Sequence, residues 1–385
     1  MPTLAPELDE QMMRRAIRLA MNGRGGVEPN PMVGCVIVKD SRAIGEGFHA
    51  QYGGPHAEPT ALAACTESPA GATAYVTLEP CCHTNKKTPP CAPRLIEAKI
   101  ARVVVGCLDP NPDVNGKGIS MLRNAGIEVV GPVLEPSAKQ LIAPFLAGVQ
   151  HRRPYVTMKW AQSADGKVAG HMGRAVRITN EPSDPVVHRL RARCDAIIVG
   201  TNTVLNDDPL LTARGVETVR RLTRVVLSNS LKIAPKSRLV ATAREHPLII
   251  YSSESSARMN ETTVDALRGA GAEVVTLPEH DGRFSFADVL HDLHARKVVH
   301  ALVEPGPTLT RYMFARGQAD RVWVFRSPKV IGESDAPAAP DVSYPQTIRI
   351  DVADDTLSEY LNPQSSVFFS AEPSADAVLV KEGRA

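Results

Sequence analysis

Residues 56–58 read His56-Ala57-Glu58, and residues 78–91 read Leu78-Glu79-Pro80-Cys81-Cys82-His83-Thr84-Asn85-Lys86-Lys87-Thr88-Pro89-Pro90-Cys91. Together they supply one imidazole, one carboxylate two residues later, and two separated thiols. A zinc ion held by one His and two Cys keeps its fourth tetrahedral position open to water, which is typical of a catalytic site. We therefore predict one zinc ion per chain, bound by His56, Cys81 and Cys91.

The order of these residues matches the zinc-deaminase signature in its first half and departs from it in its second half. That signature is H-x-E followed by P-C-x-x-C, and its glutamate transfers protons without binding the metal. Here Cys91 follows Cys81 by ten positions instead of three. We predict that zinc activates water, and that Glu58 transfers protons without binding the metal.

Each ligand candidate also has an ordinary structural explanation. A histidine before a helix is usually a cap or a surface residue, and buried cysteines are common packing residues. Cys82 adjoins Cys81 and is an alternative ligand, but Cys81 directly follows Glu79-Pro80 and is preferred. A purely structural zinc module is a further alternative, against which the three-ligand set and Glu58 argue.

Composition limits the classes of function. The 385 residues suit two domains. With a net charge of +2 and only 4% aromatic residues, the chain lacks the basic stripes with interleaved aromatics that nucleic-acid deaminases and binders show. No apolar run reaches the roughly 20 residues of a membrane span, and the charged N-terminus argues against a signal peptide. Seven cysteines, an odd number, favour a reducing cytoplasm over a disulfide framework.

Hydrophobic periodicity predicts an α/β protein with alternating strands and helices. In the first half we expect strands at 33–38, 43–48, 73–78, 102–107 and 127–130, and helices at 9–22, 56–65, 92–98, 119–124 and 137–149. The charged segment His151-Arg152-Arg153-Pro154 marks a boundary between domains 1–150 and 151–385. In the second domain we expect elements at 154–161, 184–193, 196–199, 224–227, 247–251, 264–270, 273–277, 286–295, 298–303, 309–316 and 321–325, then short strands at 347–350, 366–369 and 377–380.

The second domain carries no G-x-G-x-x-G after a strand and no P-loop, so the common nucleotide fingerprints are missing. Glu304-Pro305-Gly306-Pro307-Thr308 lies between an expected strand and an expected helix, where backbone N–H groups can hold a phosphate. An ordinary tight turn at the start of a helix is the alternative.

Several motifs resemble those of the bifunctional deaminase–reductase family of riboflavin biosynthesis. In that family the loop between the two cysteines is already long, so the wide spacing supports the resemblance. Here this loop is one residue longer, around residues 85–87, and Pro59 follows the H-A-E motif. The other matching residues and segments are Pro29-Asn30-Pro31-Met32-Val33-Gly34, Asp109-Pro110-Asn111-Pro112, Lys159, Ser163-Ala164-Asp165-Gly166-Lys167, residues 203–214, Val303-Glu304-Pro305-Gly306-Pro307 and Pro328-Lys329-Val330-Ile331-Gly332.

The resemblance implies a cytidine-deaminase-like α/β/α sandwich followed by a dihydrofolate-reductase-like α/β domain. It implies zinc-dependent hydrolytic deamination of 2,5-diamino-6-(5-phosphoribosylamino)pyrimidin-4-one. It implies that NADPH then reduces the ribosyl side chain of the deaminated product to a ribityl chain. The expected binding partner is this small-molecule substrate, and we expect no binding to nucleic acid or to a membrane. We also expect a cytoplasmic homo-oligomer, either a dimer or a tetramer.

Family roles carried over by position define a site in each domain. Substrate contacts of the deaminase are Asn30, Asp109 and Asn111, and Lys86 or Lys87 meets the substrate phosphate. Expected NADPH contacts are Ala161, Arg177, Thr203, Asp207, Gly306, Pro307 and Thr308. Substrate contacts of the reductase are Ala175, Arg191, Leu211, Arg214 and Glu304.

Two departures from the family pattern affect the expected reductase site. The family's Ser-x-Trp-Ile-Thr is here Ala175-Val176-Arg177-Ile178-Thr179, and its Leu-Asp-Ser is replaced within Leu227-Ser228-Asn229-Ser230-Leu231. These changes leave an alternative open, namely a deaminase-only paralogue whose second domain is a degenerate reductase.

Overall fold

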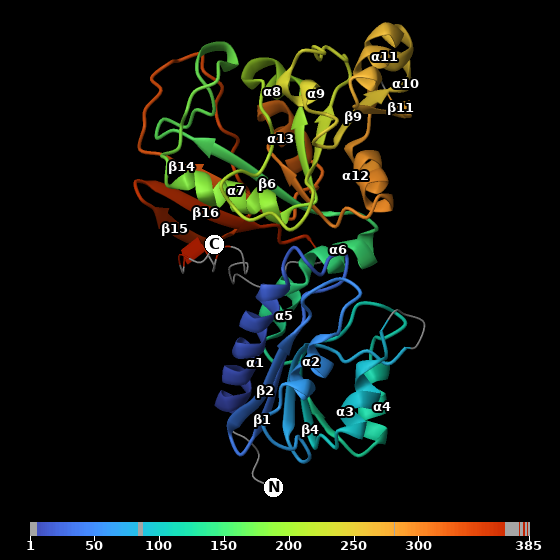
Figure 1. The fold of residues 1–385 in the computed structure, drawn as a ribbon. Coiled ribbons are helices and arrows are strands. Elements are labelled where there is room, and N and C mark those ends of the chain that lie inside the picture. Colours follow the sequence, from blue (N-terminus) through green and yellow to red (C-terminus); the bar gives the residue numbers. More distant parts are fainter. Residues whose placement is uncertain are drawn as a thin grey trace. The chain divides into compact units, whose positions relative to one another are not determined.

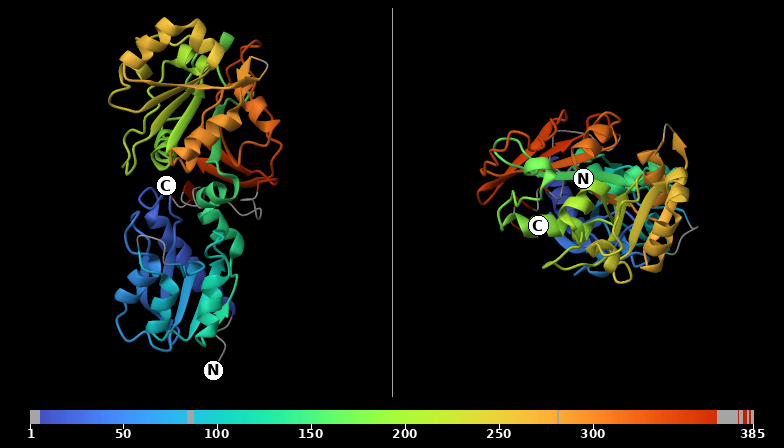
Figure 2. Two further views of the ribbon diagram at one scale, coloured as in Figure 1. Left: turned by 90° about the vertical axis from the view of Figure 1, so that its right-hand side faces the viewer. Right: turned by 90° about the horizontal axis from the view of Figure 1, so that it is seen from above.

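In the computed structural model the chain forms two units, Met1–His151 and Arg152–Ala385 (Figure 1, Figure 2). The structure describes residues 6–83, 88–280 and 282–365, together with residues 377, 380, 381 and 383. Both units contain a sheet and helices, as an α/β protein requires. Within the described residues, no helix has the length and apolar character needed to cross a membrane.

The first unit is built on a five-stranded sheet with the order β2-β1-β3-β4-β5. Its strands are β1 (Gly34–Lys39), β2 (Arg42–Phe48), β3 (Thr73–Leu78), β4 (Arg102–Cys107) and β5 (Glu128–Val130). Strand β1 is antiparallel to β2 and β3, whereas β3, β4 and β5 are parallel. Because Leu78 pairs with Cys107, the carboxyl ends of β3 and β4 lie side by side.

Helices cover both faces of this sheet (Figure 1). They are α1 (Pro6–Ala20), α2 (Ala57–Ala63), α3 (Cys91–Glu97), α4 (Lys117–Asn124), α5 (Glu135–Leu141) and α6 (Ala143–His151), and Met21–Gly23 forms a 3-10 turn. Val36 and Val38 pack with α1 on one face. Cys35 and Ile37 pack on the other face with α2, α3 and α4. This alternation follows from the two-residue period of a strand that is buried on both faces.

The second unit is built on a nine-stranded sheet with the order β10-β9-β8-β7-β13-β6-β14-β16-β15. Its strands are β6 (Tyr155–Gln162), β7 (Ala196–Gly200), β8 (Thr223–Leu227), β9 (Leu248–Ser253), β10 (Glu273–Leu277), β13 (His300–Val303), β14 (Arg321–Arg326), β15 (Gln346–Val352) and β16 (Asp355–Leu361). Neighbours from β10 to β14 are parallel, and β16 and β15 add an antiparallel edge. A separate hairpin joins β11 (Glu279–His280) to β12 (Arg283–Phe284).

Two core clusters lie on the two faces of this sheet. The helices are α7 (Ser183–Arg193), α8 (Thr201–Asp207), α9 (Arg238–Ala241), α10 (Glu254–Met259), α11 (Glu261–Gly269), α12 (Phe286–Ala295) and α13 (Pro307–Phe314), with a 3-10 turn at His171–Gly173. Helices α7, α8, α9 and α11 contribute to one cluster, and α12 and α13 contribute to the other. The central strands therefore read as continuous apolar runs, as expected for parallel strands covered on both faces.

Some expected elements are wrong. The single helix expected at 137–149 is two helices, α5 and α6, that are divided at Ile142. Pro144 lacks the N–H that a continuous helix would donate to the carbonyl of Gln140. The strand expected at 377–380 is also wrong, because Ala377 and Val380 are helical. The strand expected at 366–369 lies outside the described residues.

Strand β16 escapes the sequence pattern because it buries a charged side chain. Glu359 is fully buried in the middle of this strand. Its carboxylate accepts hydrogen bonds from Trp323 Nε1 at 2.9 Å and from Thr347 Oγ1 at 2.9 Å. A buried carboxylate is tolerated only with such partners, which sequence alone does not reveal. Residues 201–207, for which no element was expected, form α8.

Candidate active sites

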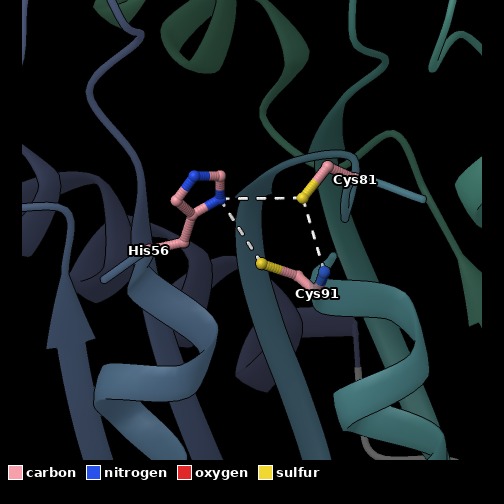
Figure 3. A group of neighbouring side chains, drawn as sticks. All are labelled: His56, Cys81 and Cys91. Carbon is pink, nitrogen blue, oxygen red and sulfur yellow. Dashed lines mark hydrogen bonds between the residues drawn. The ribbon is translucent and has the colours of Figure 1, made fainter. Parts of the chain in front are cut away.

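Three segments of the first unit bring His56, Cys81 and Cys91 together (Figure 3). His56 precedes the first residue of α2, Cys81 follows β3, and Cys91 is the first residue of α3. His56 Nδ1 lies 3.6 Å from Cys81 Sγ and 3.4 Å from Cys91 Sγ. The three donor atoms all lie within 4.8 Å of one another. One imidazole nitrogen and two sulfurs are a donor set that suits zinc.

Neighbouring groups orient these donors. Thr88 Oγ1 lies 3.0 Å from His56 Nε2. A proton on Nε2 therefore leaves the lone pair of Nδ1 directed at the two sulfurs, as Figure 3 shows for the ring and the two cysteines. The backbone N–H of Cys91 donates to Cys81 Sγ at 3.4 Å. The hydrogen bond with Cys81, burial and the charge of Glu58 all raise the pKa of the Cys91 thiol. A cation is therefore needed to stabilise the thiolates.

Glu58 is the second residue of α2 and is only 3% exposed. Burial raises the pKa of its carboxyl group, and the charge of Cys81 adds to this effect while His56 opposes it. A carboxyl group whose pKa lies nearer to neutrality is better suited to take up and release a proton. Glu58, His56 and Cys81 line a cavity of about 330 Å³.

The other residues expected in the deaminase site also line this cavity, namely Asn30, Asp109 and Asn111. Cys91 is fully buried and is not among the lining residues of this cavity. Cys82 is outside the ligand group, and packs partly buried against the core. Lys86 and Lys87 lie outside the described residues.

The same cavity is also lined by three residues for which no role was expected, His49, Glu79 and Phe145. His49 Nδ1 lies 2.8 Å from the carbonyl oxygen of Pro55, which can only accept a hydrogen bond. His49 Nε2 is therefore the acceptor for Asn30 Nδ2 at 3.2 Å, leaving the amide oxygen of Asn30 available to a ligand. A single histidine without a spaced partner gives no sequence signal.

The second unit has a larger cleft of about 1490 Å³ at the carboxyl ends of β6, β7, β8 and β13. This edge is where ligands bind in open parallel sheets. All the expected NADPH contacts line the cleft, namely Ala161, Arg177, Thr203, Asp207, Gly306, Pro307 and Thr308. Gly306 precedes α13, and a Cβ atom there would meet no other heavy atom within 4 Å. The helix N-terminus is thus open to a phosphate group, so the residues fit a dinucleotide.

A charged cluster lies at one part of this cleft. Arg191 donates to Glu304 in a bidentate arrangement, with Nε to Oε1 at 2.9 Å and Nη2 to Oε2 at 2.8 Å. Burial by itself would raise the pKa of Glu304, but the charges of Arg191 and Lys159 outweigh it and lower that pKa to about 2. Burial lowers the pKa of Lys159, while the charge of Glu304 opposes that effect. Lys159, which matches the family but for which no role was expected, lines the cleft together with Glu304.

The expected reductase substrate contacts are not all at the cleft. Ala175 and Glu304 line it, but Arg191, Leu211 and Arg214 are not among its described lining residues. Leu211 is buried with a φ of 53°, a conformation that costs energy for a side chain of this size. Arg177, at the edge of the cleft, donates to Asp184 Oδ2 at 2.9 Å.

Comparison with known proteins assigns both units. The family model "RibD C-terminal domain" matches residues 154–354, and "Cytidine and deoxycytidylate deaminase zinc-binding region" matches residues 6–107. Riboflavin biosynthesis protein RibD of Aquifex aeolicus is 41% identical over 328 residues, which cover 85% of this chain and 89% of that protein. The chain belongs to the RibD family. RibD of Escherichia coli is 38% identical over 340 residues, covering 85% of this chain and 89% of its own length.

Solved RibD structures have the same fold. Acinetobacter baumannii RibD, form 1, has a TM-score of 0.78 at 32% identity and covers 94% of this chain and 100% of its own. A deaminase/reductase from Thermotoga maritima has a TM-score of 0.78 at 36% identity and covers 93% of this chain and 99% of its own. The expected fold class is confirmed.

Membership of the RibD family makes the chain a bifunctional deaminase and reductase of riboflavin biosynthesis, with zinc and NADPH as its cofactors. These predictions are confirmed. Nothing in the comparisons supports the deaminase-only alternative, because the reductase family model extends through residues 154–354. The altered residues at positions 175, 177, 228 and 229 lie within that match.

Proposed function

We propose that residues 1–150 deaminate 2,5-diamino-6-(5-phosphoribosylamino)pyrimidin-4-one and that residues 151–385 reduce the ribosyl chain of the product. The Thermotoga maritima relative is named a diaminohydroxyphosphoribosylaminopyrimidine deaminase/5-amino-6-(5-phosphoribosylamino)uracil reductase. The observation that carries the proposal is the convergence of His56, Cys81 and Cys91 within 4.8 Å, beside the buried carboxyl group of Glu58.

In the deaminase unit, His56, Cys81 and Cys91 would hold the zinc ion. Bound zinc supplies Lewis acidity that lowers the pKa of a water molecule towards neutrality. Glu58 takes a proton from water and delivers it to the ring nitrogen. After the hydroxyl has added to the ring carbon, Glu58 takes the second proton from that hydroxyl and delivers it to the amino group, which leaves as ammonia while the carbonyl forms. Asn30, Asp109 and Asn111 hold the pyrimidine in a cavity of about 330 Å³, near the lower end of typical ligand-site volumes.

In the reductase unit, the start of α13 at Gly306, Pro307 and Thr308 would hold the cofactor phosphates. Ala161, Arg177, Thr203 and Asp207 complete the cofactor site. NADPH supplies the hydride, so the protein contributes binding, orientation and charge. Ala175, Arg191, Leu211, Arg214 and Glu304 form the proposed substrate site, with Glu304 oriented by its bidentate contact with Arg191.

We also propose a cytoplasmic location and a homo-oligomer, either a dimer or a tetramer. The first proposal is supported by the cysteines, since none of the seven, all of which are described, forms a disulfide. Light scattering on the purified protein measures the oligomeric state, and a monomer would contradict the second proposal.

An assay of the purified protein with the pyrimidine, with and without NADPH, tests the function. Ammonia release should need no NADPH, and NADPH oxidation should follow only after deamination. Glu58→Ala should abolish ammonia release. Undiminished ammonia release by that variant would contradict the proposed proton transfer. NADPH oxidation by that variant should be restored by supplying the deaminated pyrimidine.

A further inference from the structure

Glu79 is a carboxylate buried between the metal-binding segment and the loop that follows β4. It is 2% exposed and lies directly after β3, two residues before Cys81. Such a group is costly to bury without hydrogen-bond donors. Its donors show what this carboxylate does in the fold.

Both carboxylate oxygens of Glu79 accept backbone N–H groups from residues 109–119. Oε2 accepts from Asp109 at 3.3 Å and from Gly116 at 2.9 Å. Oε1 accepts from Ile119, in the first turn of α4, at 3.2 Å. One carboxylate therefore fixes both ends of the loop that carries Asp109 and Asn111.

The hydrogen bonds continue within the loop towards the cavity. Asp109 Oδ1 accepts from the backbone N–H of Asn111 at 2.9 Å. The conformation of Asn111 thus depends on Asp109, which is in turn held by Glu79. Both Asp109 and Asn111 line the cavity that contains Glu58.

The same loop packs directly on the metal-binding segment. Val114, only 1% exposed, forms a small buried cluster with Cys81 and Cys91. At Gly118, a Cβ atom would lie 2.0 Å from the carbonyl oxygen of Pro80. The loop and the metal-binding segment are therefore in contact at close range, and Glu79 joins them.

We propose that Glu79 is a positioning residue, which sets the distance between the metal ligands and the substrate contacts Asp109 and Asn111. This inference rests on the proposed substrate-binding role of those two residues. It predicts that a change at Glu79 weakens substrate binding while leaving the metal site and the chemical step largely intact.

The decisive variant is Glu79→Gln, which has nearly the same shape but replaces one acceptor oxygen with an NH2 group that faces N–H donors. We expect KM for ammonia release to rise about tenfold, as the loss of a hydrogen bond to a charged group predicts. The value of kcat per bound zinc should stay within about twofold, because Glu58 and the ligands are unchanged. A merely structural role would reduce the folded fraction and would not move KM.

The matched control is Glu97→Gln, the same substitution at an exposed position of α3. It should leave KM and zinc content unchanged. Ile119→Pro is a second variant, since proline is tolerated in the first turn of a helix and removes only one of the three donors. It should raise KM less than Glu79→Gln does. If Glu79→Gln fails to fold, an unchanged KM in Ile119→Pro overturns the inference.

Asp109→Ala and Asn111→Ala separate this inference from the proposed function. If they raise KM while a zinc-loaded Glu79→Gln protein retains the wild-type KM, the positioning role is wrong and the proposed substrate site stands. If both alanine variants keep the wild-type KM, the proposed substrate site itself is wrong.

Discussion

The two active sites place their chemistry in different parts of the polypeptide. In the deaminase, four side chains from residues 56–91 supply the ligands and the proton carrier, next to a cavity of about 330 Å³. In the reductase, a cleft of about 1490 Å³ is lined by segments from Lys159 to Pro337. The first site depends on a few reactive side chains, whereas the second depends on a shaped surface for a cofactor that carries the hydride. Substitutions should therefore have large effects in the first site and graded effects in the second.

The largest effect is expected at Glu58. Glu58→Gln keeps the shape of the side chain but removes the group that transfers the proton. Ammonia release should fall by about 10²–10⁴-fold, the usual contribution of a general acid–base group. NADPH oxidation with the deaminated pyrimidine should be unchanged, and separate assays of the two steps measure both effects. If ammonia release by Glu58→Gln fell by less than about tenfold, the deaminase site would not depend on single side chains more than the reductase site does.

Zinc binding distinguishes the two adjacent cysteines. Cys81→Ser should weaken zinc binding by more than about 100-fold, since even residues that only orient a ligand cost 10–100-fold. Cys82→Ser is the control, because Cys82 lies outside the ligand group. Zinc content after dialysis against a chelator measures the difference. Equal zinc loss in both variants would contradict the assignment of Cys81, and loss of the reductase activity would show that zinc serves both sites.

In the reductase unit, the loss of one partner of a buried ion pair should lower the stability of the fold. Arg191 and Glu304 are 13% and 16% exposed. Arg191→Met leaves the carboxylate of Glu304 without its bidentate partner and should lower the free energy of unfolding of this unit by about 3 kcal/mol. Trp160 and Trp323, the two tryptophans of the chain, both lie in this unit, so their fluorescence during urea unfolding follows it selectively.

The pH dependence of that destabilisation follows from the lowered pKa of Glu304. A folded pKa of about 2, below the ordinary value of 4.5, means that the ion pair stabilises the unit above pH 4.5 and that this stability is lost as the pH falls towards about 2. The difference between wild type and Arg191→Met should shrink over that range. The control is Arg174→Met, which removes the contact between Glu333 and an arginine side chain that is 63% exposed. It should lower the free energy of unfolding by no more than about 1 kcal/mol.

The same contrast explains what could be predicted from the sequence. Short apolar runs bounded by turn residues predicted most strands of both sheets, and β3, β4 and β10 have the expected bounds. Strand β16 was missed because Glu359 interrupts the apolar pattern of the strand. The Trp323 side chain that donates to Glu359 is 36 residues away in the sequence, so the local pattern does not reveal it. His49 was missed because a lone histidine without a spaced partner forms no motif. Glu79 was missed because its donors are backbone N–H groups 30 to 40 residues further along the chain, to which side-chain motifs give no clue. The reductase contacts required resemblance to a family, because a backbone surface that holds phosphates leaves no reactive side chains to recognise.

The smallest effect is expected at Arg177, where the family's Trp is replaced. Its guanidinium is 55% exposed and already paired with Asp184. Arg177→Ala should raise the Kd of NADPH only about threefold, because exposed charged contacts contribute up to about 1 kcal/mol. Arg311→Ala, an exposed arginine of α13 outside the cleft lining, is the control for a change of net charge. Fluorescence titration of NADPH measures both. A loss of 100-fold or more would place most of the cofactor affinity in one side chain, and the reductase cleft would then resemble the deaminase site in its dependence on single residues.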